Sequence, residues 1–166
     1  HLIHLGHKRI AHIGGPADTF SSVDRLEGFR LAMAQAGLGV DEGLIVGSDY
    51  TFEGGGEAFR RLMEVSRPPT AIFAANDQTA LGAIREATRS GLGVPGQMSI
   101  VGFDGVTASA QSEPPLTTIY LSLNQIGRLA ADMLLSQLES GRREIRTVTV
   151  RGELVVRGST SAPSRD

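Results

Sequence analysis

Hydrophobic residues along the chain follow two alternating patterns. Short apolar runs of strand length are followed by longer segments in which apolar residues recur every three or four positions, the period of an amphipathic helix. Strand runs cover 10–14, 44–47, 70–74, 98–102, 116–119, 148–150 and 154–156, and helical periods cover 26–36, 58–65, 80–87 and 126–138. Strands that alternate with helices are typical of right-handed βαβ units. We therefore expect an α/β fold with a doubly wound parallel sheet that has helices on both faces.

The two ends of the chain depart from this alternation. His1 to Gly6 resembles the last turns of a helix that closes on a glycine. There is no initiator methionine and no charged start followed by an apolar stretch, as a signal peptide would have. We expect the chain to begin part-way through a larger protein. Ser159 to Asp166 is polar, and we expect it to be loose.

Composition and charge narrow the classes of partner. The 166 residues are 40% apolar, which is enough for one domain, or one and a fraction, with a buried core. No apolar run reaches the length of a membrane span. Sixteen basic and eighteen acidic residues leave no excess of positive charge, so we do not expect this segment to bind DNA itself. The absence of cysteine excludes disulfides and thiolate metal sites, and it fits a reducing cytoplasm.

Polar and aromatic residues follow four of the predicted strands. Ligands of an open parallel sheet bind outside the carboxyl ends of its strands, so residues at those ends are candidates for binding. Carboxylate, amide and guanidinium groups hydrogen-bond to hydroxyls, and aromatic rings stack on the apolar face of a sugar ring. The combination predicts a site for a sugar, and a nucleoside fits the same groups. The candidate binding residues are Asp24, Arg25, Tyr50, Asn76, Asp77, Phe103 and Asp104.

Each of these residues also has a common non-binding role. Asp24, Asn76 and Asp77 stand where a helix N-cap is expected, and Asp104 stands where a turn is expected. Only their shared position at one edge of the sheet favours binding over capping.

The sequence contains no pattern that favours catalysis or metal binding. All four histidines lie within the first twelve residues, so no strand end carries a histidine that could act as a general base. We expect no enzyme activity and no cofactor. His1, His4 and His7 are spaced like a metal clamp but have no carboxylate nearby, so we expect no metal. His12 is expected to be exposed or half-buried within its strand. The glycines at 54–56 are not followed by the lysine of a phosphate-binding loop. Two explanations of this run remain: a flexible start of a helix, or close packing against a neighbouring element.

Several motifs together resemble one known family. They are Leu5-Gly6-His7, Gly14-Gly15-Pro16, the run Pro69 to Asp77 with its Asn-Asp ending, Ser99 to Asp104, Pro114-Pro115-Leu116-Thr117-Thr118 and Arg157-Gly158-Ser159-Thr160. In this order and spacing they resemble the effector-binding core of LacI/GalR-type bacterial transcription regulators, which is similar in fold to periplasmic sugar-binding proteins. The resemblance covers essentially the whole chain.

The resemblance implies a two-lobed core that holds a small effector in the cleft between its lobes. Arg25, Asn76 and Asp104 match family residues that hydrogen-bond to effector, and Tyr50 stands where an aromatic residue stacks on it. Leu121 departs from the family, several members of which carry a glutamine there. The implied organisation is one lobe over 1–119, a segment of the other lobe over 120–150, a return strand over 151–160 and a tail over 161–166.

The resemblance also implies partners. The regulators are cytoplasmic homodimers, and the helix at 78–89 corresponds to part of their dimer surface. They bind DNA through an N-terminal helix-turn-helix domain that has no counterpart in this sequence. The sequence therefore predicts the ligand-sensing core of a LacI-type regulator. The alternative is a periplasmic sugar-binding protein of a transport system, which would be preceded by a signal peptide.

Overall fold

Six strands form one sheet in the computed structural model, which describes residues 1–141 and 145–164. The strands are β1 (Ile10–Gly14), β2 (Ile45–Gly47), β3 (Ala71–Ala74), β4 (Ser99–Asp104), β5 (Thr117–Tyr120) and β6 (Glu153–Val155). Their spatial order is β2-β1-β3-β4-β5-β6, and only β6 runs antiparallel to its neighbour. The carboxyl ends of the five parallel strands therefore meet at one edge, and the strand order reverses between β1 and β3.

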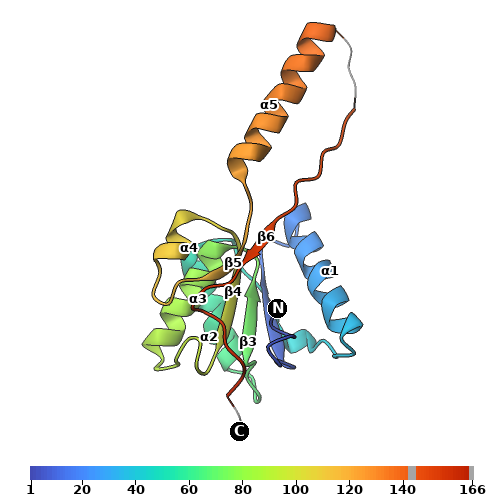
Figure 1. The fold of residues 1–166 in the computed structure, drawn as a ribbon. Coiled ribbons are helices and arrows are strands. Elements are labelled where there is room, and N and C mark those ends of the chain that lie inside the picture. Colours follow the sequence, from blue (N-terminus) through green and yellow to red (C-terminus); the bar gives the residue numbers. More distant parts are fainter. Residues whose placement is uncertain (142–144, 165–166) are drawn as a thin grey trace.

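Helices cover both faces of this sheet (Figure 1). The helices of the chain are α1 (Phe20–Gln35), α2 (Phe52–Met63), α3 (Asp77–Arg89), the short α4 (Thr107–Gln111) and α5 (Leu123–Ser140), with a 3-10 turn at Glu42–Leu44. The helix α1 lies on one face, and α2 and α3 lie on the other (Figure 1). The predicted doubly wound α/β fold is confirmed.

Successive side chains of each strand point to opposite faces of the sheet, so the core has two layers. Ala11 and Ile13 of β1 join the cluster under α2 and α3, whereas Ile10 joins the cluster under α1 with Phe29 and Met33. Because successive side chains of a strand point to opposite faces, one apolar run supplies both layers.

The helices α2 and α3 approach each other closely through glycines. A Cβ added to Gly55 would collide with the backbone of Thr79, and one added to Gly82 would collide with the carbonyl of Phe52. The run at 54–56 lies inside the first turns of α2 rather than ahead of a helix. Of the two alternatives for that run, close packing is confirmed.

The segment after β6 corrects the expectation of a loose tail. Ser159 is fully buried, where its hydroxyl donates to the Ile100 carbonyl at 2.6 Å and accepts from the Thr117 amide at 2.8 Å. The Ser161 carbonyl accepts from Nε2 of the buried His7 at 2.9 Å. The prediction was wrong at least to Ser161, because hydroxyls along this polar segment bond to β4 and β5. Residues 165 and 166 lie outside the described residues.

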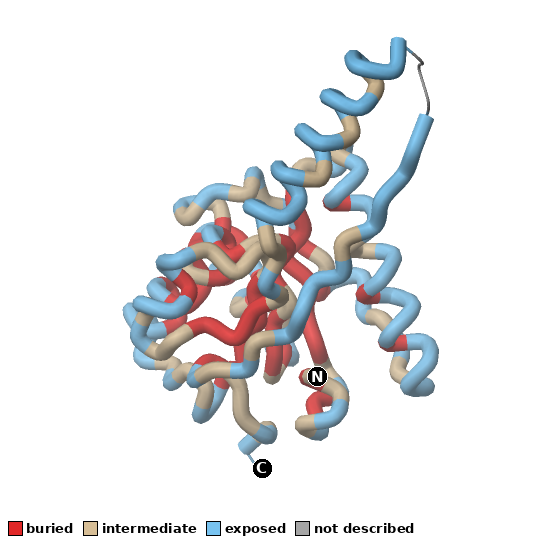
Figure 2. The backbone as a smooth tube through the Cα atoms, turned by 45° about the horizontal axis from the view of Figure 1, so that its top comes forward, coloured by how far each residue is buried: buried red, intermediate tan, exposed pale blue. Residues whose placement is uncertain are grey.

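Two further features lie near the C-terminal end: a predicted strand that does not form, and a helix that packs on neither face of the sheet. The strand predicted at 148–150 is irregular in the structure. The helix α5 projects from the carboxyl edge of the sheet and has no buried residue (Figures 1 and 2). Among the described residues, no helix is long and apolar enough to cross a membrane.

Candidate ligand-binding site

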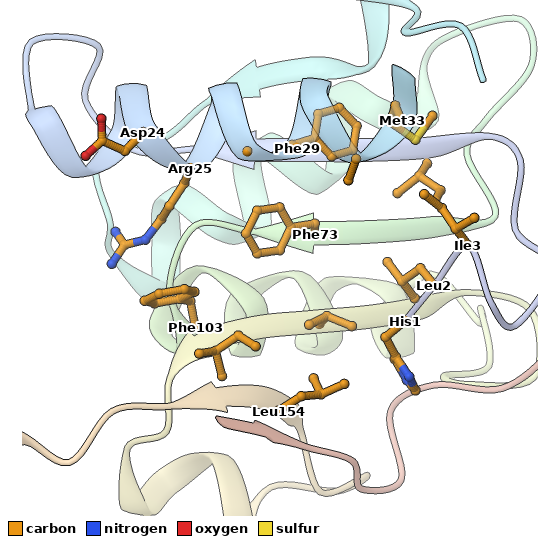
Figure 3. Close-up of a pocket in the computed structure, with 15 residues that line it drawn as sticks. His1, Leu2, Ile3, Asp24, Arg25, Phe29, Met33, Phe73, Phe103 and Leu154 are labelled. Atoms are coloured by element: carbon orange, nitrogen blue, oxygen red, sulfur yellow. The ribbon is translucent and has the colours of Figure 1, made fainter. Parts of the chain in front are cut away.

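A groove of about 530 Å³ runs along the sheet face that α1 only partly covers (Figure 3). Its lining is mainly apolar, with Asp24 and Arg25 at one end and His1 beside Leu2 at the other (Figure 3). Phe29 and Met33 of α1 and Phe73 of β3 form part of the apolar section, which reaches Leu2 and Ile3 at the far end. Asp24, Arg25 and Phe103 form the end at the carboxyl edge.

Arg25 reaches from α1 across to the end of β4. Its guanidinium carbon lies 4.2 Å from the centroid of the Phe103 ring, and its Nη2 lies 3.6 Å from Oδ1 of Asp104. The second distance is longer than a direct hydrogen bond, so the two charged groups attract each other without using up their hydrogen-bonding capacity. A carboxylate, a guanidinium and an aromatic face are thereby presented together.

The surroundings of Asp104 shift the pKa of its carboxyl. Partial burial raises the pKa of this carboxyl, the positive charge of Arg25 acts to lower it, and the negative charge of Asp77 raises it further. The net direction is upward because desolvation is the largest influence.

The backbone of Asp104 is held in an unusual conformation. Its φ is +113°, a region that side chains other than glycine rarely adopt, and Gly105 follows with φ of +73°. Strained residues of this kind cluster at functional sites, where the surrounding structure holds them in place. The strain is a reason, independent of its charge, to keep Asp104 as a candidate site residue.

Tyr50 lies at the same edge but does not line the groove. Its hydroxyl bonds to Oγ of Ser21 at 3.0 Å and to Oγ1 of Thr19 at 3.2 Å. Its ring packs against Gly15, so closely that a Cβ at position 15 would collide with it. Burial acts to raise the pKa of Tyr50, but the hydrogen bonds from Ser21 and Thr19 lower it overall. Tyr50 therefore ties the loop after β2 to the start of α1.

Asn76 performs the capping role that the sequence left open. Its Oδ1 accepts from the Thr79 amide at 2.9 Å, which caps α3, and its Nδ2 donates to the Tyr50 carbonyl at 3.0 Å. It lies beside the reversal of strand order between β1 and β3, next to Tyr50 and outside the groove lining.

Asp77 and Asp24 take different positions from those expected. Asp77 is fully buried, and its carboxylate faces Thr118 of β5 and the Val106 amide rather than the groove. Asp24 lies on the groove, exposed, within α1. The capping role for Asp24 is wrong, because α1 begins four residues earlier, at Phe20, and Thr19 occupies the cap position.

His12 is the residue that sequence reasoning misplaced most. It is fully buried, stacked between the rings of Phe29 at 5.4 Å and Phe73 at 5.0 Å, and its Nδ1 donates to the Phe73 carbonyl at 3.0 Å. Burial lowers its pKa to about 4. The expectation of an exposed or half-buried side chain was wrong. The available signal was its position in a central strand that is buried on both faces.

Metal binding gains no support from the described residues. They contain no cluster of three or more histidine or acidic side chains placed to hold an ion. Of the three N-terminal histidines, His1 bonds to Oγ1 of Thr160 at 3.0 Å and His7 bonds to Oγ1 of Thr70 at 2.9 Å.

Comparison with known proteins identifies the class. Residues 1–160 match the family described as periplasmic binding protein-like domain, and the chain belongs to that family. Its resemblance to LacI-type regulators, noted above from sequence motifs, is confirmed by its relatives. It is 40% identical over 162 residues to the HTH-type transcriptional repressor CytR of Escherichia coli (strain K12), covering 98% of this chain and 48% of that protein.

Solved structures lead to the same class. A complex of the transcriptional regulator CelR with cellobiose superposes with a TM-score of 0.91 at 36% identity, over 95% of this chain and 48% of that one. The lac repressor dimer bound to operator and the anti-inducer ONPF superposes with a TM-score of 0.90 at 34% identity, over 98% of this chain and 56% of that one. The chain spans about half the length of the curated relatives it matches.

Proposed function

We propose that this chain is the ligand-sensing core of a LacI-type transcriptional regulator. It binds a small effector, a sugar or a nucleoside, at the carboxyl edge of the sheet, and the bound effector modulates DNA binding by a helix-turn-helix domain of the whole protein. A coupling of about 1–3 kcal/mol between the two sites is typical of such systems. The chain acts by binding rather than by catalysis, and the whole protein works in the cytoplasm.

The observation that carries this proposal is the cluster of Arg25, Phe103 and Asp104 at the end of the groove. Arg25 and Asp104 are 18% and 31% exposed, which leaves both accessible to a ligand while partly desolvated. Effector hydroxyls bridge the guanidinium and the carboxylate, and the ring of Phe103 supports the apolar face of the effector. Asp24 lies on the same groove, and Tyr50 and Asn76 lie outside its lining at the same edge of the sheet; all three are proposed as further effector contacts.

The proposed organisation has two lobes. Residues 1–119 and the return strand at 151–160 form the lobe that carries the cluster, and 120–150, with α5, belongs to the second lobe. The second lobe covers the carboxyl edge from the opposite side and completes the cleft. The uncovered state of α5 supports this assignment, since its apolar residues have no other partner in the lobe described here.

The whole protein is proposed to act as a homodimer, partly through α3. Gln78, Arg85 and Thr88 of this helix are exposed. The Arg85 guanidinium also lies over the Phe52 ring of α2, 4.3 Å from its centroid. The similarity to a lac repressor dimer supports a paired arrangement.

The test is calorimetric titration of the full-length protein with ribose, cellobiose, cytidine and adenosine. Arg25→Ala and Asp104→Ala each remove a charged hydrogen-bonding group, whose loss costs about 1.5–3 kcal/mol, so the affinity for the best compound should fall tenfold or more. Arg30→Ala is the matched control. It also removes an arginine from α1, but Arg30 only pairs with Glu42 on the surface at 2.7 Å. Unchanged affinity in Arg25→Ala and Asp104→Ala would refute the site.

A periplasmic sugar-binding protein is the second candidate, since its site would contain the same groups. The segment upstream of His1 in the gene separates the two functions: a helix-turn-helix supports the regulator and a signal peptide supports the transport protein.

A further inference from the structure

The carboxylate of Asp77 lies directly beneath the loop that carries Asp104. Its Oδ1 accepts from Oγ1 of Thr118 at 2.5 Å, and its Oδ2 accepts from the Val106 amide at 2.8 Å. Burial raises the pKa of this carboxyl, and the polar groups around it act in the opposite direction. The carboxylate is therefore held by one donor from β5 and one from the loop after β4.

The sheet leaves a space for this carboxylate. A Cβ added to Gly102 of β4 would collide with Oδ1 of Asp77, so the glycine admits a carboxylate where any other residue would exclude it. Asp77 does not cap α3, because Asn76 does so and the Asp77 oxygens bond to other elements. A role confined to the helix end is thereby excluded.

The loop above the carboxylate is bent sharply at Asp104 and Gly105, both of which have positive φ. Consecutive amides in such a bend form a concave donor site for an anion. Here the Val106 amide bonds to the Asp77 carboxylate. On the other side, the Asp104 carbonyl accepts from the Leu121 amide at 3.1 Å. The strained residue is therefore held from both of its sides.

We infer that Asp77 is a positioning residue: by binding the Val106 amide and the Thr118 hydroxyl, it holds Asp104 in the conformation that presents its side chain to Arg25, and it does not contact the effector itself. This inference rests on the proposed function, in which Asp104 is a direct contact. It reassigns Asp77 from the set of direct contacts to the support beneath them.

The test compares Asp77→Asn with a matched change on the same helix. An asparagine at this position keeps the size of the side chain but presents an NH₂ group where one of the carboxylate oxygens now accepts. Glu86→Gln is the control, because Glu86 is also a buried carboxylate of α3 but pairs only with Arg60 and Arg89, each at 3.2 Å, on the side towards α2.

Two readouts are measured on the full-length protein, well below its thermal midpoint. In Asp77→Asn, amide hydrogen exchange at Val106 should accelerate at least tenfold while exchange at Ile13 and Ile72 in the core stays unchanged. The affinity for the best binder among ribose, cellobiose, cytidine and adenosine should fall at least tenfold. Glu86→Gln should leave the affinity within twofold of wild type and the exchange at Val106 unchanged.

The outcomes separate this inference from the proposed function. If wild type binds one of the compounds and Asp77→Asn binds it equally well, the inference is overturned and the proposed function stands. If wild type binds none of them, the proposed function fails, and exchange at Val106 still decides whether Asp77 holds the loop. Should Asp77→Asn not fold, Thr118→Val removes one of the donors. A loss of affinity of about threefold would then support the inference, and wild-type affinity with wild-type exchange at Val106 would overturn it.

Discussion

His12 is a titratable side chain enclosed between two aromatic rings. Burial disfavours its charged form, which lowers its pKa to about 4, although the hydrogen bond to the Phe73 carbonyl opposes this shift. In the unfolded chain a histidine titrates near pH 6.5. Between about pH 6.5 and pH 4 the unfolded state therefore binds a proton that the folded state does not. The contribution of His12 to stability is complete above pH 6.5 and is lost as the pH falls towards 4.

His12→Phe should remove this part of the pH dependence. Between pH 7.5 and pH 5.5, we expect His12 to account for about 1.4 kcal/mol of the fall in the free energy of unfolding of the wild type. The variant keeps an aromatic ring between Phe29 and Phe73, and its free energy of unfolding should fall by about 1.4 kcal/mol less than that of the wild type over the same pH range. Urea denaturation at the two pH values measures the difference. His4→Phe, at an exposed position, is the control and should behave as wild type. An equal fall in His12→Phe and wild type would contradict a neutral, buried His12.

At the scale of elements, the pairing of α2 with α3 depends on the absence of side chains at their contact. Gly82 lies against the Phe52 carbonyl, and Gly55 lies against the backbone of Thr79. Asn76, which begins α3, also holds the carbonyl of Tyr50, so the position of α3 bears on the loop beside the site. The glycine run of α2 is thus a packing surface for α3. Through Asn76, the position of α3 also affects the loop that carries Tyr50 at the carboxyl edge.

Gly82→Ala should destabilise the protein because its Cβ has no space against α2. Overpacking of this kind costs about 1–3 kcal/mol, and the contact here is with backbone, which cannot move aside as a side chain can. Gly28→Ala is the matched control: it also lies within a helix but has no neighbour within 4 Å of the added Cβ. The control should be stabilised by up to about 1 kcal/mol through helix propensity. Guanidinium denaturation compares the two, and equal stability would disprove the close contact.

At the scale of the whole molecule, α5 is the part without a packing partner. Leu134 and Leu138 are 60% and 70% exposed, and they lie on the same side of the helix as Ile126 and Ala130. An apolar face of this kind is an association surface. In the whole regulator we propose that the second lobe covers it.

The isolated chain of 166 residues should therefore self-associate through α5. Sedimentation velocity should show a species larger than the monomer that grows with protein concentration. The double variant Leu134→Gln, Leu138→Gln should shift the distribution towards monomer by weakening the apolar contact. Arg128→Gln, on the opposite side of α5, is the control and should associate as wild type does. A monomer at every concentration tested would show that α5 does not mediate association.

Local pattern determined the class and the order of the elements. The spacing of apolar residues and the Gly and Pro breaks depend only on neighbours in the chain, so β1 to β6, and all the helices except the short α4, could be predicted from them, with uncertain ends. The strand predicted at 148–150 failed because its apolar residues find no neighbouring strand to pair with. The candidate edge could also be predicted, since the carboxyl ends of parallel strands must lie together.

Tertiary structure decided which polar residues of the candidate edge line the groove and which bond to other parts of the chain. Asn76 and Asp77 are adjacent in sequence, yet one caps α3 beside Tyr50 and the other is buried beneath Asp104. The partners of Asp77 in β5 and in the loop after β4 lie 41 and 29 positions away along the chain. Likewise, Ser159 is ordered by bonds to Ile100 and Thr117, which no local pattern connects to it. The sequence by itself determined where polar groups gather. Only the folded chain determined which of them are satisfied internally and which remain free to bind, because hydrogen bonding is settled between segments that are distant in sequence.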